Sequence, residues 1–65
     1  MKNFSEALKG MLQGQIWKFG ADTLFKVDDF DLMIMRGKWV TLPAWEFDFY
    51  KERDIWSEGE QDGHI

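Results

Sequence analysis

Four consecutive residues near the middle of the chain combine a flat aromatic ring with two positive charges. They are Arg36, Gly37, Lys38 and Trp39. Stacking of a nucleotide base on an aromatic side chain contributes roughly 1–3 kcal/mol, and arginine binds phosphate through two parallel hydrogen bonds. We therefore expect Trp39 to stack on a base while Arg36 and Lys38 hold phosphate groups.

Trp17 and Lys18 repeat this combination of ring and charge, and Trp45 adds another ring further along the chain. Trp45 would complete a stacking pair if its segment lies beside Trp39. A plainer interpretation also holds, because a tryptophan on a strand commonly lies in a core or an interface, and a basic turn is commonly solvated. The sequence alone leaves both interpretations open.

Residues that would support catalysis or metal binding are few. His64 is the only histidine and lies near the end of the chain, which makes a histidine general base improbable. The acidic pairs, Asp28 with Asp29 and Glu46 with Asp48, lack the spacing of a calcium-binding loop and suit turns and a solvated strand face. We therefore expect no enzyme, no catalytic residue, no metal site and no cofactor.

The composition narrows the classes of partner. Twelve acidic and eight basic residues give a net charge of −4, whereas duplex nucleic acid needs a basic surface. No apolar run approaches the roughly 20 residues of a membrane-spanning helix, so we expect a cytoplasmic protein. The 65 residues include four Trp, six Phe and one Tyr. Because one small domain has little interior for so much aromatic surface, we expect self-association as a dimer or higher oligomer.

The first element that positions these side chains is a predicted helix near the N-terminus. Asn3 is a good N-cap, with Glu6 at the position of a capping-box carboxylate. Apolar residues then recur at helical spacing as far as Leu12, and Gly14 suits the residue that closes the helix. Gly10 costs about 1 kcal/mol inside a helix, so it either permits close packing or is a weak point.

Two short strands are predicted next, over residues 15–19 and 23–27, with Leu24 and one of its neighbours facing inward. Asp28 and Asp29 mark the turn that follows, because aspartate side chains hydrogen-bond to their own local backbone.

Residues 31–42 then read as a β-hairpin, since Gly37 supplies the positive φ that a tight turn needs. The first arm, residues 32–35, is Leu-Met-Ile-Met and does not alternate with polar residues. We therefore expect it at the centre of a small sheet, with both faces against apolar surface.

The segment after Pro43 has two interpretations. Strict alternation favours a fifth strand over residues 44–49, followed by a helical turn or loop over 50–56. A helix is the alternative, because Trp45, Phe49, Glu52 and Trp56 recur at a spacing near four. Residues 57–65 are polar and lack periodicity, so a loose tail is predicted. The expected fold is therefore α+β: a single domain over residues 1–56, with one N-terminal helix packed on a bent antiparallel sheet of four to five strands.

Residues 3–18, NFSEALKGMLQGQIWK, carry a family resemblance. Phe-Ser-Glu-Ala-Leu opens the helix, Gly14 precedes the first strand, and Asp54-Ile55-Trp56 stands near the end of the chain. The chain resembles a family of small phage and prophage proteins that includes the second type of Thoeris anti-defence proteins. The family's first strand usually has paired basic residues just before a Trp, where this chain has Ile16-Trp17-Lys18. The resemblance implies a phage counter-defence protein that oligomerises and sequesters a cyclic nucleotide-type immune signal without catalysis, inside a bacterial host.

An alternative function rests on the acidic residues of the C-terminal third, which are Glu46, Asp48, Glu52, Asp54, Glu58, Glu60 and Asp62. Such a surface could mimic nucleic acid and block a basic host defence protein, with the interleaved aromatic residues as anchors. A plain assembly module without any ligand is a third possibility.

Overall fold

Helix α1 spans Phe4–Leu12 in the computed structural model, which describes residues 1–59 of the chain. The Asn3 side chain accepts a hydrogen bond from the backbone N–H of Glu6 at 2.9 Å, and the Glu6 carboxylate accepts one from the Asn3 N–H at 3.4 Å. The predicted capping box is therefore confirmed. Gly14, with φ of +96°, follows the last turn of the helix, where a glycine costs little in the left-handed conformation.

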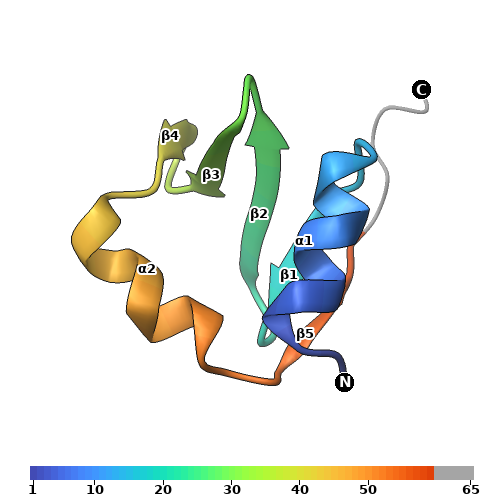
Figure 1. Ribbon diagram of the computed structural model, residues 1–65. Coiled ribbons are helices and arrows are strands. Elements are labelled where there is room, and N and C mark those ends of the chain that lie inside the picture. Colours follow the sequence, from blue (N-terminus) through green and yellow to red (C-terminus); the bar gives the residue numbers. More distant parts are fainter. Residues whose placement is uncertain (60–65) are drawn as a thin grey trace.

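Within residues 1–59 the sheet has five strands in the order β4-β3-β2-β1-β5, and all neighbouring strands are antiparallel (Figure 1). The strands are β1 (Trp17–Phe19), β2 (Thr23–Asp28), β3 (Asp31–Met35), β4 (Trp39–Thr41) and β5 (Trp56–Glu58). The predicted hairpin is confirmed as β3 and β4, with Gly37 at φ of +76° in their turn. The expected central position of its first arm needs correction, because β2 is the central strand and β3 lies beside it.

The segment after Pro43 forms helix α2 (Ala44–Lys51), so the predicted strand over residues 44–49 is wrong. The alternating pattern is compatible with both structures, and packing decides between them. Phe47 meets Phe4 of α1 with ring centroids 5.5 Å apart, and Tyr50 meets Phe25 of the sheet at 5.0 Å. Residues three apart lie on one side of a helix, whereas they would point to opposite faces of a strand.

The fifth strand is β5, so the loop and tail predicted over residues 50–65 need correction at Trp56–Glu58. This strand pairs with β1 on one side, and Lys2 bridges to Trp56 on the other. The ordered fold therefore extends beyond residue 56. The remainder of the predicted tail, residues 60–65, lies outside the described residues.

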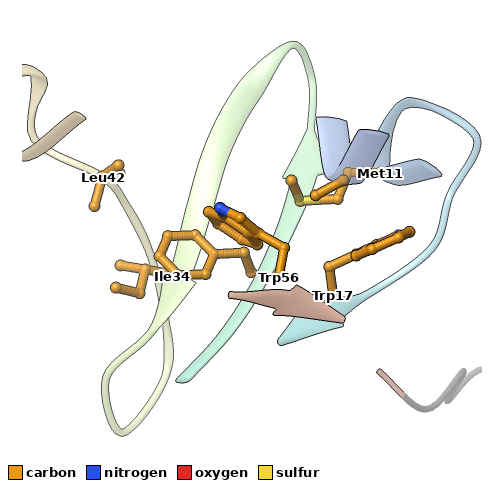
Figure 2. Packing of buried hydrophobic residues seen from close by; sticks show 7 residues of the cluster. Met11, Trp17, Ile34, Leu42 and Trp56 are labelled. Carbon is orange, nitrogen blue, oxygen red and sulfur yellow. The ribbon is translucent and has the colours of Figure 1, made fainter. Parts of the chain in front are cut away.

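Both helices lie on one face of the sheet and enclose the core with it. Its buried members are Ala7, Met11, Trp17, Phe25, Ile34, Leu42 and Trp56. Trp56 is 0% exposed and lies between Ile34 and Trp17 in the packing of Figure 2. Its indole N–H donates to the backbone carbonyl of Tyr50 at 3.3 Å, which joins α2 to β5. Neither helix is long and apolar enough to cross a membrane.

Candidate functional site

The strand register divides the sheet residues between two faces. Phe25 lies directly opposite Ile34 on β3, and both are buried in the core. Their neighbours Lys26 and Met33 are also opposite each other, and successive residues of a strand point to opposite faces. Lys26 and Met33 therefore point away from the core, to the face that neither described helix covers.

We call this uncovered surface the open face. The same alternation places ten side chains on it: Lys18, Leu24, Lys26, Met33, Met35, Trp39 and Ser57, which are half-buried, and Asp28, Asp31 and Thr41, which are exposed. The predicted inward orientation of Leu24 is therefore wrong, whereas its neighbour Phe25 does face the core. Antiparallel sheets with one solvated face normally alternate apolar and polar residues, so an apolar stripe through β3 marks this face as unusual.

Trp39 and the lysines form the part of the open face that could bind a ligand. The Lys26 Nζ lies 4.7 Å from the centroid of the Trp39 ring, within the range of a cation–π contact. Lys18 lies opposite Leu24 and therefore diagonally from Lys26, and diagonal positions are about 7–8 Å apart. Two ammonium groups and one half-buried indole thus share a surface in a protein whose net charge is −4.

The structure separates Arg36 from Trp39. Arg36 follows Met35 at the start of the turn, and its guanidinium forms a two-pronged ion pair with the Glu46 carboxylate of α2, on the helix side of the sheet. The hydrogen bond from Arg36 lowers the pKa of Glu46, and the same contact raises the pKa of Arg36. In this conformation Arg36 links the β3–β4 turn to α2, rather than holding phosphate beside Trp39.

The remaining predicted ligand residues lie in three different places. Lys38 is exposed in the turn that precedes β4. Trp17 is 3% exposed, and its indole N–H donates to the Gln15 side chain at 3.0 Å. Trp45 is 80% exposed on α2, so it does not pair with Trp39 within one chain. Of the six residues predicted to bind the ligand, only Trp39 and Lys18 share the open face.

Lys26 is the residue that sequence reasoning missed. Its signal is the alternation in β2, where Lys26 and Asp28 occupy one face while Phe25 and Val27 occupy the other. This alternation alone does not show that Lys26 and Trp39 share a face, because the two residues are thirteen positions apart. The pairing of β2, β3 and β4 is needed as well.

A hollow lies between the end of α1 and the β2–β3 turn. It has a volume of about 300 Å³ and is lined by Met11, Leu12, Gly14, Val27, Asp29 and Phe30. Its single charged residue is an acid, so it offers no cation for a phosphate. Among residues 1–59, no three His, Cys, Asp or Glu side chains lie close enough together to hold a metal ion. The open face is therefore the stronger candidate site.

Comparison of the chain with protein-family models, with curated proteins and with solved structures finds no match.

Proposed function

We propose that the protein binds, without transforming it, a small anionic ligand that carries an aromatic ring, and that the open face is its site. The observation that supports this most directly is Trp39 with Lys26 at 4.7 Å from its ring. Trp39 offers a ring on which a base can stack. Lys26 and Lys18 offer charges for one or two phosphate groups.

Nucleotides are the ligand class that combines these features. The resemblance of residues 3–18 to the anti-defence family extends the proposal: the ligand is a cyclic nucleotide-type immune signal, and its capture serves phage counter-defence in the bacterial cytoplasm. The adaptable side chains of Met33 and Met35 lie on the same face, and unbranched methionines accommodate ligands of varied shape.

The rival function, an acidic inhibitor of a host defence protein, gains less support. Glu46 is paired with Arg36, and Asp48 lies 3.1 Å from the Lys51 ammonium. These pairs neutralise two of the acids on which a nucleic-acid mimic would depend. Glu60 and Asp62 lie outside the described residues.

Tryptophan fluorescence during titration with cyclic dinucleotides and cyclic ADP-ribose isomers tests the proposal. We expect quenching in the wild-type protein and in Trp45→Ala, which removes an exposed indole remote from the open face. Trp39→Ala should lose at least about tenfold in affinity, since one stacking contact contributes roughly 1–3 kcal/mol. Lys26→Gln should also bind more weakly, with a smaller salt dependence. Equal affinity in Trp39→Ala and the wild type would refute the site.

A further inference from the structure

The turn between β2 and β3 presents an aromatic ring on a strained backbone. Asp29 and Phe30 have φ of +53° and +68°, the pattern of a two-residue hairpin turn in which the second position normally holds glycine. A bulky side chain is an outlier in this conformation. Phe30 is nevertheless 95% exposed: it borders the hollow that Met11, Leu12 and Val27 line, but almost none of its surface is buried there.

The same turn concentrates negative charge. Asp28, Asp29 and Asp31 flank Phe30 within four positions, and none of them takes part in the two ion pairs of the described part of the chain. Asp28 and Asp31 lie opposite each other across β2 and β3. They end the open face on the side of the turn, and the next row of that face contains Lys26. The open face thus has an acidic end, formed by Asp28 and Asp31, beside a basic and apolar area. We call residues 28–31 the acidic tip.

We propose that a second copy of this chain covers the open face, and that the acidic tip of each copy lies on the Lys26 and Trp39 area of the other. The two copies are related by a two-fold axis that crosses β2 and β3 between two rows of paired residues. One row is Asp28 with Asp31, and the other is Lys26 with Met33. Rotation about this axis reverses the order of the rows along the strands. β2 of one copy therefore lies over β2 of the other, and β3 lies over β3. Asp28 then lies opposite Lys26 of the second copy, and Lys26 lies opposite its Asp28.

The charges select this arrangement over a simpler one. An axis through the Lys26 row would place the two Lys26 ammonium groups against each other, which like charges oppose. Moving the axis by half a row, to lie between the Lys26 row and the Asp28 row, replaces that repulsion with two attractive pairs of Asp28 and Lys26. It also brings the β2–β3 turn of each copy to the row of Leu24, Met35 and Trp39 on the other, where the Phe30 ring, 95% exposed in a single copy, would make apolar contact.

The accessible surface of the chain is large enough for such an interface. A specific interface buries about 800 Å² on each side, which is less than a fifth of the 4487 Å² of accessible surface of the chain. The contact is isologous, so it closes at two copies. No other subunit is needed to explain the exposed ring.

This inference rests on the proposed function in one respect, because the acidic tip would occupy the ligand's place. Carboxylates would stand where the phosphates bind, and the Phe30 ring would stand where the base stacks on Trp39. The dimer is therefore the ligand-free form, and a nucleotide competes with the second copy. Capture of the ligand would separate the two subunits.

Charge reversal with mixing tests the dimer. The probes are wild type, Lys26→Asp and Asp28→Lys, each checked for folding by circular dichroism and then followed by sedimentation velocity from about 1 to 100 μM. We expect the wild type to dimerise and each variant alone to associate at least about tenfold more weakly. An equimolar mixture of the two variants should dimerise again, because Asp28 of one meets Lys26 of the other and the substituted pair is also of opposite charge. Phe30→Gly should remain folded and monomeric.

Three results would overturn the inference: a monomeric wild type throughout this range, folded single variants that still dimerise as the wild type does, or a mixture that stays monomeric. Adding cyclic di-AMP as the probe separates the two proposals. If it binds through Trp39 and the dimer dissociates, both are supported. If the dimer forms and no cyclic nucleotide binds, the proposed function fails alone; if a nucleotide binds a wild type that never dimerises, the further inference fails alone. Binding that leaves the dimer intact refutes the competition.

Discussion

The open face and the opposite face of the sheet, which the two helices cover, consist of alternate residues of the same strands. We call the opposite face the covered face, and its side chains differ in kind from those of the open face. On the covered face, rings meet edge to face at close range, as Phe25 meets Trp56 with centroids 4.9 Å apart. On the open face the apolar residues include Leu24, Met33 and Met35, with Trp39 beside a lysine. Rigid aromatic packing specifies one structure, whereas methionine and lysine side chains adapt to what they meet. We therefore expect the covered face to contribute most of the stability, and we propose the open face for binding.

The largest expected effect contrasts one tryptophan from each face. Trp56→Ala empties the centre of the core and should lower the free energy of unfolding by about 3–5 kcal/mol, which approaches the whole stability of a small domain. Trp39→Ala should lower it by about 1 kcal/mol or less, while it abolishes most ligand affinity. Urea denaturation followed by circular dichroism measures both. Equal losses of stability would show that the two faces do not differ in this way.

Gly10 lies in α1, which packs on the covered face, and it offers a second test of how tightly that face is packed. A Cβ at this position would collide with the side chains of Gln15 and Trp17. Alanine is the better helix former by about 1 kcal/mol, but we expect Gly10→Ala to destabilise the protein by about 1–3 kcal/mol because the indole must move. Ser5→Ala, at an exposed position of α1, is the control and should change stability by about 0.5 kcal/mol at most. A stabilised Gly10→Ala would mean that the contact between helix and sheet is loose.

Much of the fold could be predicted from local signals in the sequence. The capping box of Asn3 and Glu6 and the turn at Gly37 act over three or four residues, and both are visible without knowledge of the sheet. The strand prediction for residues 44–49 failed because their alternating rings fit both the period of a strand and that of a helix. Only the core contacts of Phe47 and Tyr50 make the segment a helix. The pairing of β5 with β1 joins residues about 40 positions apart, which no local pattern reveals.

The candidate site could be predicted less well, for a related reason. Arg36, Lys38 and Trp39 lie close together in the sequence, but in the structure Arg36 pairs with Glu46 of α2 and Lys38 is exposed in the turn, whereas Trp39 lies on the open face. Arg36 meets Glu46, ten residues on, only because α2 folds back against the turn. Lys26 reaches Trp39 only through the register of three strands. Pairing on a sheet therefore decides which charges accompany a ring, and the sequence shows the charges without the pairing.

The smallest expected effect concerns Arg36 and Glu46, which link the edge of the sheet to α2. Arg36 holds the pKa of Glu46 below its ordinary value, so the folded state binds its proton less readily than the unfolded state does. The stability that the pair contributes is therefore fully present above the unfolded pKa of about 4.3, and it is lost as the pH falls through the lower folded value. We expect Glu46→Gln to be less stable than the wild type at pH 7, and the difference to shrink as the pH falls through that range. Urea midpoints across pH 2.5–7 measure it, with Asp48→Asn as the control for an exposed pair on the same helix. A difference that stays constant with pH would show that the Arg36 contact does not depend on the Glu46 charge, and that packing of the side chains alone joins α2 to the covered face.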